Sequence, residues 1–134
     1  MGPSTINEVR MSDEKRPDVW IGHVRMTTSA LDESEAFMKE IGLRSIFRGE
    51  EIAVMELRGG THIVLAQDKD NAPDKAPFDF MVEDLSATHT QYVEQGYSVS
   101  DIEEGRIHSS FVVTEPGGNQ IVVNSSHVPD HNLV

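Results

Sequence analysis

Apolar and polar residues alternate along short stretches of the chain, and longer stretches with helical spacing lie between them. Residues 23–28 alternate with the period of a β-strand. Residues 31–41 place apolar side chains on one face of a helix, and Gly42 follows where a left-handed residue ends a helix. The same order returns later, with a strand over 78–82, a helix over 85–95 and Gly96 after it.

This order is an internal repeat. Gly42 and Gly96 are 54 residues apart, and the pairs Gly59-Gly60 and Gly117-Gly118 are 58 residues apart. Each glycine pair precedes an Ile-Val strand, which indicates a tight hairpin. The remaining strands are expected over 45–47, 52–57, 98–102 and 107–114. Each half therefore predicts a strand, a helix and three more strands.

The repeat divides the chain into five segments. Residues 1–16 are polar and charged, which favours a flexible arm. The first βαβββ module is expected over 17–66 and the second over 78–126. A linker rich in Asp, Asn, Lys and Pro covers 67–77, and 127–134 forms a polar tail.

Alternation also divides the strand residues into two faces, because successive side chains point to opposite sides of a sheet. One face is uniformly apolar and is predicted to lie beneath the helices: Val24, Met26, Ala53, Met55, Leu57, Ile63, Leu65, Phe78, Phe80, Phe111, Val113, Ile121 and Val123. The other face is mixed, as expected of a ligand cavity: His23, Arg25, Thr27, His62, Val64, Ala66, Asp79, Met81, His108, Ser110, Gln120, Val122 and Asn124.

Composition narrows the classes of partner. The 134 residues include 23 acidic and 11 basic side chains, for a net charge of −12, which argues against nucleic acid and anionic membranes. No apolar run approaches the roughly 18–20 residues of a membrane span, and no signal-peptide pattern is present. The chain has no cysteine, so thiolate metal sites and cysteine nucleophiles are excluded. We expect a cytoplasmic protein that acts on a small molecule.

The duplicated module resembles the vicinal oxygen chelate superfamily, which includes glyoxalase I, extradiol dioxygenases and bleomycin-resistance proteins. Three segments carry the resemblance: His23-Val24 with the helix around Ser34, the segment Phe80–Leu85, and the segment Thr114–Asn119, which is similar to the family's Asp-Pro-x-Gly-Asn hairpin. The resemblance implies an α+β fold in which two βαβββ modules form a curled mixed sheet. This sheet is an open cup, with the ligand inside and the helices outside.

The resemblance also implies where a metal would bind. Metal-binding members take ligands from four strand positions, which here correspond to His23, Val64, Pro77 and Val122. Only His23 carries a donor atom, whereas a divalent ion needs three or four. We therefore expect no cofactor. The alternative is a divalent metal ion at a shifted site around His23 and His62, to which Asp79 and His108 would contribute.

The polar residues of the cup face are the candidate ligand-binding residues: His23, Arg25, His62, Asp79, His108, Gln120 and Asn124. The histidines are expected to be neutral hydrogen-bonding groups, and a metal-free general base with Arg25 beside it is a further alternative. Arg25 needs an anionic partner, which is either Asp79 or a ligand carboxylate or phosphate.

Three functions remain open. The first is metal-free binding of a small molecule, as in the bleomycin-resistance branch. The second is a metal-dependent lyase, isomerase or dioxygenase with a shifted histidine site. The third is a partner-binding domain with a vestigial cup. By resemblance we also expect a homodimer.

Overall fold

The chain forms two βαβββ modules, described over residues 15–126 in the computed structural model. The first module consists of β1 (His23–Thr28), α2 (Leu31–Glu40), β2 (Arg44–Arg48), β3 (Ile52–Glu56) and β4 (His62–Gln67). The second consists of β5 (Lys75–Val82), α3 (Leu85–Glu94), β6 (Ser98–Val99), β7 (Ser110–Thr114) and β8 (Gln120–Ser125). The expected arm and tail lie largely outside the described residues.

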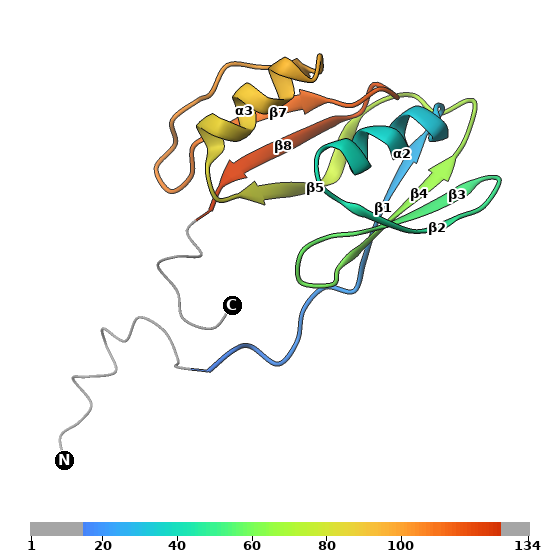
Figure 1. The fold of residues 1–134 in the computed structure, drawn as a ribbon, viewed down its shortest axis with the longest axis horizontal. Coiled ribbons are helices and arrows are strands. Elements are labelled where there is room, and N and C mark those ends of the chain that lie inside the picture. The colour runs from blue at the N-terminus through green and yellow to red at the C-terminus, as the bar shows by residue number, and fades with distance from the viewer. Residues whose placement is uncertain (1–14, 127–134) are drawn as a thin grey trace.

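Each module contains its own mixed sheet of four strands. The strand orders are β1-β4-β3-β2 and β5-β8-β7-β6. The first and last strands of each module pair in parallel, and the other pairs are antiparallel. The two sheets meet where β1 and β5 lie next to each other (Figure 1). The duplication and the expected α+β fold are confirmed.

The hairpins before β4 and β8 have the same backbone hydrogen bonds. The N–H of Leu57 donates to the carbonyl of Thr61 at 2.8 Å, and that of Glu115 donates to Asn119 at 2.9 Å. Gly60 and Gly118 lie at the same position of the two turns, with φ angles of 96° and 94°. Because residues other than glycine rarely adopt this conformation, the matched glycines of the repeat have a structural cause.

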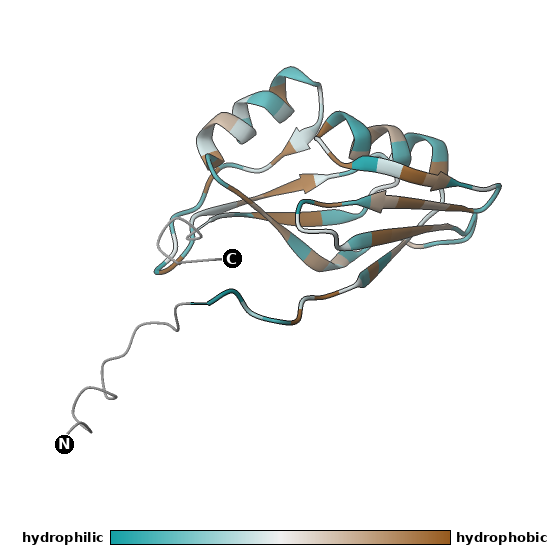
Figure 2. Ribbon diagram, turned by 60° about the horizontal axis from the view of Figure 1, so that its bottom comes forward, coloured by the Kyte–Doolittle hydropathy of each residue, from teal (hydrophilic) through white to brown (hydrophobic). Residues whose placement is uncertain are grey.

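The core lies between the helices and one face of the two sheets. Figure 2 shows both helices on the same side of the strands, where hydrophobic and hydrophilic residues alternate. Phe37 and Met38 of α2 are fully buried, as is Phe111 of β7. Ten of the thirteen residues predicted for the apolar face are buried, and Val24, Leu57 and Phe78 pack against them partly buried. The predicted division into two faces is therefore confirmed.

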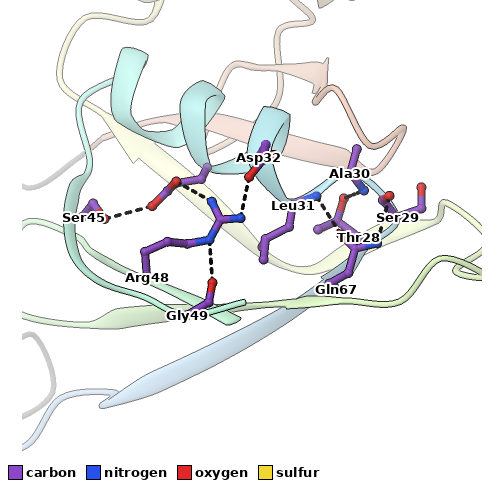
Figure 3. Close-up of polar contacts among 10 residues, drawn as sticks. Thr28, Ser29, Ala30, Leu31, Asp32, Ser45, Arg48, Gly49 and Gln67 are labelled. Carbon is purple, nitrogen blue, oxygen red and sulfur yellow. Dashed lines mark hydrogen bonds and ion pairs between the residues drawn. The ribbon is translucent and has the colours of Figure 1, made fainter. Parts of the chain in front are cut away.

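Helix α2 is held by side chains of neighbouring strands. It has no side-chain cap of its own, and the free N–H of Leu31 donates to Oε1 of Gln67 at 2.9 Å. Arg48 of β2 pairs with Asp32 and Glu35 of this helix (Figure 3), and these two carboxylates raise the pKa of the Arg48 guanidinium. The helix is thereby anchored at its first turn and along one side.

Several element boundaries differ from the sequence predictions. Strand β5 begins at Lys75, within the expected linker, and includes Pro77. Proline is tolerated here because β5 is the edge strand of its sheet. Strand β7 begins only at Ser110, so the predicted strand over 107–114 is too long by three residues. Strand β6 covers only Ser98–Val99 of the expected 98–102, and an isolated bridge joins Glu103 to Ser110.

Candidate functional site

The face of the sheets opposite the helices carries the predicted site residues. His23, Arg25, Asp79 and Gln120 are exposed. His62, His108 and Asn124 are half-buried. None of the seven belongs to the core.

His23 and His62 are two predicted site residues whose rings meet across two strands. They are partners in the parallel register of β1 and β4, and their ring centroids are 5.4 Å apart in an edge-on arrangement. Nε2 of His62 lies 3.3 Å from Oε2 of Glu56. The other oxygen of this carboxylate, Oε1, forms an ion pair with Arg44. The hydrogen bond from Arg44 lowers the pKa of Glu56, and the hydrogen bond from His62 lowers it to a smaller extent.

Asp79 does not neutralise Arg25. Oδ2 of Asp79 accepts a hydrogen bond from Nδ2 of Asn124 on the neighbouring strand β8. Among residues 15–126, the guanidinium of Arg25 has neither a hydrogen bond nor an ion pair, although it is charged at neutral pH. Asp79, one of the two partners considered for Arg25, is therefore excluded, and the exposed guanidinium is open to solvent.

His108 and Gln120 lie apart from the histidine pair. His108 precedes β7 in a loop, and its Nδ1 lies 2.7 Å from the carbonyl oxygen of Ser125. Gln120 begins β8, opposite Lys75 in the register of the second sheet. Within the described part of the chain, no three His, Cys, Asp or Glu side chains are grouped so that they could hold a metal ion. The expected convergence of Asp79 and His108 on the histidine pair does not occur.

A pocket of about 220 Å³ lies at one end of this face, where the two modules meet. Its lining includes Arg25 and Thr27 of β1 and Lys75 of β5. Asn71 and Asp74, from the segment that connects the modules, complete its polar lining. The pocket thus combines residues of both modules and of their connection.

A buried polar network fixes the two modules at the same junction. Ser34 of α2 donates to Oε1 of Glu115 at 2.6 Å, and it shares a 2.8 Å hydrogen bond with Thr28. Oε2 of Glu115 accepts from both the backbone N–H and Nδ2 of Asn119, each at 3.0 Å. Glu115 is only 1 % exposed, so these donors replace the water that its oxygens would otherwise bind.

Comparison with known proteins places this architecture in a family. The family model described as "Glyoxalase/Bleomycin resistance protein/Dioxygenase superfamily" matches residues 20–123, which is most of the chain. The chain belongs to this superfamily. No curated protein sequence matches it significantly.

Solved structures of the superfamily share the fold at low sequence identity. Lactoylglutathione lyase from Agrobacterium tumefaciens superposes with a TM-score of 0.69 at 17 % identity, over 83 % of this chain and 96 % of that one. The bleomycin resistance determinant encoded on transposon Tn5 gives 0.65 at 15 % identity, over 81 % and 99 %. A bleomycin-binding protein from Streptomyces verticillus, solved with copper(II)-bleomycin, gives 0.62 at 15 %, over 83 % and 99 %.

The metal implied by part of the superfamily does not fit the residues present. At the four positions assigned by resemblance the chain has His23, Val64, Pro77 and Val122. In the register of the sheets Val64 lies opposite Arg25, and Val122 lies opposite Asp79. Valine and proline side chains have no donor atoms, so His23 alone cannot complete a site for a divalent ion.

Four residues of the site region escaped the sequence prediction. Glu56 could have been found, because Ala53, Met55 and Leu57 on the core face place it on the open face. Lys75 was assigned to the linker, because residues 67–77 are rich in Asp, Asn, Lys and Pro. Asn71 and Asp74 lie in an irregular segment for which alternation gives no signal.

The two described helices contain ten residues each. No helix within residues 15–126 is long and apolar enough to cross a membrane.

Proposed function

We propose that this chain is a small-molecule-binding protein of the bleomycin-resistance type, which holds its ligand on the open face of the two sheets. The observation that carries the proposal is the replacement of metal ligands by Val64, Pro77 and Val122 on that face. A protein that had kept the cup for metal chemistry would need donors at these positions. Binding of an organic ligand has no such requirement.

The chemistry of the open face supports this proposal. Its candidate contacts are His23, Arg25, His62, Asp79, His108, Gln120 and Asn124. They offer one permanent cation, one carboxylate, two amides and three imidazoles beside the apolar side chains of Val64 and Val122. A few placed polar groups among apolar surface are typical of small-molecule sites.

A thermal-shift screen with a library of cationic, neutral and anionic metabolites tests the proposal. Because a ligand that binds only the folded state stabilises it, we expect at least one compound to raise the melting temperature in a concentration-dependent manner. The screen is run on protein treated with a chelator. If no compound of any charge class raises the melting temperature, the proposal is wrong and a domain with a vestigial cup is favoured.

A second candidate is a metal-dependent lyase, isomerase or dioxygenase with a shifted site. The contact of the His23 and His62 rings, with Glu56 beside them, favours it. Metal analysis of protein purified without an affinity tag distinguishes the two candidates. A stoichiometric divalent ion that is lost in both His23→Ala and His62→Ala supports the enzyme, and its absence supports the binding protein.

Assembly and location complete the proposal. By resemblance to the superfamily we propose a homodimer, which sedimentation would report as a mass of twice 14.9 kDa. A mass of 14.9 kDa would contradict it. We also propose a cytoplasmic location, which a chain without cysteine fits.

A further inference from the structure

The pocket at the module junction has an unusual charge balance for so acidic a chain. Arg25 of β1 and Lys75 of β5 both line it, and Asp74 is the one carboxylate in its lining. Two cations and one anion leave the lining with one positive charge, whereas the chain as a whole carries −12. A local excess of positive charge favours a ligand with a single negative charge.

The charged ends of both cations are unused. In the described part of the chain, neither the Arg25 guanidinium nor the Lys75 ammonium has a hydrogen bond or an ion pair. Asp74 forms an ion pair with neither of them within the described residues, and its Oδ1 accepts from the backbone N–H of Lys75 at 2.7 Å. Hydrogen bonds between a cation and a carboxylate are about twice as strong as neutral ones, so an anion in this pocket would gain from both residues.

Asn71 adds a donor that the fold does not satisfy. Its Nδ2 is shielded from solvent and has no hydrogen-bond partner within the described residues. An unsatisfied buried donor destabilises a protein, because its hydrogen bond to water is lost without a replacement. Since Asn71 also lines the pocket, an acceptor oxygen bound there can remove this penalty once the amide turns toward it.

The rest of the lining limits the size and polarity of the ligand. The apolar part comes from Met26, Ala72, Ala76 and Pro77. The volume of about 220 Å³ is below the roughly 300–1,000 Å³ of sites for drug-sized molecules. The pocket therefore suits a compact molecule with an apolar body and one charged end.

We infer that the junction pocket binds a small organic monocarboxylate, with its carboxylate between Arg25 and Lys75 and an oxygen in reach of Asn71. A phosphate dianion is disfavoured, because Asp74 leaves only one net positive charge to oppose it. The inference rests on the proposed binding function and adds the class of ligand to it.

The test is calorimetric titration of the full chain with a panel of small monocarboxylates, from propionate to benzoate and phenylacetate, each beside its primary amide. We expect at least one carboxylate to bind on the order of tenfold more tightly than its amide, because the amide lacks the charge that both cations recognise. Arg25→Gln and Lys75→Gln should each remove this preference, and Asn71→Ala should weaken binding of the acid.

Lys39→Gln is the matched control, since Lys39 is an exposed cation in the last turn of α2, away from the pocket. It should leave the preference unchanged. Melting temperatures of all four variants verify that they are folded. Equal binding of acids and amides, or a preference that persists in Arg25→Gln, would overturn the inference.

Failure of the inference and failure of the proposed function give different results. If a neutral or cationic metabolite stabilises the protein in the thermal-shift screen and no monocarboxylate binds, the inference is wrong and the binding function stands. If neither experiment yields a ligand, both are wrong.

Discussion

The hydroxyl of Ser34 donates a 2.6 Å hydrogen bond to the carboxylate of Glu115 across 81 residues of sequence. Ser34 lies in α2 of the first module, and Glu115 begins the last hairpin of the second. In the first module Leu57 occupies the position that corresponds to Glu115. The two modules share a backbone plan. Glu115, however, links one module to the other, and the first module has no acidic residue at the matching position.

Loss of the Glu115 carboxylate should destabilise the whole fold. Glu115→Ala leaves the backbone N–H of Asn119 buried without an acceptor and removes the bond to Ser34. We expect the free energy of unfolding to fall by roughly 2–4 kcal/mol in urea titrations.

The isosteric substitution refines this prediction. Glu115→Gln keeps one oxygen to accept from Asn119, so it should cost only about 1–2 kcal/mol. If alanine and glutamine are equally tolerated, the network does not hold the modules together.

Gly117 should not tolerate a methyl group. An added Cβ would lie 2.8 Å from Oε2 of Glu115 and 3.2 Å from Oγ of Ser34, and closer still to Oγ1 of Thr28. Gly117→Ala is therefore expected to lower the free energy of unfolding by roughly 1–3 kcal/mol or more. Gly22→Ala is the control, because nothing lies within 4 Å of the added atom, and a similar loss in both variants would contradict the explanation.

The pKa of Glu56 should depend on Arg44. Because Arg44, and to a smaller extent His62, lowers this pKa in the folded state, Glu56 stabilises the fold above its ordinary pKa of 4.5. That contribution is lost as the pH falls through the lowered value. In Arg44→Gln, carboxyl NMR titration should show the pKa of Glu56 shifted upward.

Arg58→Gln provides the comparison for this titration, since Arg58 pairs with Glu83 and not with Glu56. It should leave the pKa of Glu56 where it is. An unchanged pKa in Arg44→Gln would show that the ion pair is absent in solution.

Restoring donors should create a metal site. In the combined variant Val64→Glu, Pro77→His and Val122→Glu, His23 would have three further ligands at the positions implied by the superfamily. We expect this variant to bind Zn²⁺ at one ion per chain by calorimetry and the unmodified chain to bind none. If the variant fails to bind the ion while remaining folded, the positions are assigned wrongly.

The sequence predicted the fold well because its strongest signals are local and occur twice. Alternation identified the core face correctly at Met55, Ile63 and Val123, and the glycines marked the ends of both helices and both hairpins. It also placed His23 and His62 on one face, where the structure makes them neighbours.

The contacts between the modules could not be predicted in this way. Alternation says which side a residue faces, but it does not say which strands of different modules lie next to each other. Nor does alternation choose between partners on one face: Asp79 pairs with Asn124 on the neighbouring strand of its own module and not with Arg25 of the first module. Lys75 and Asn71 were missed because the stretch expected to be a linker has no periodic pattern.

The most direct test of ligand binding without the superfamily's metal is to measure one ligand from the screen twice. Its affinity is determined by calorimetry on chelator-treated protein, and again after addition of Zn²⁺, Mn²⁺ or Ni²⁺. We predict the same affinity in both states and no stoichiometric ion in the purified protein. An affinity that appears only with the metal, and disappears in His23→Ala and His62→Ala, would contradict the account.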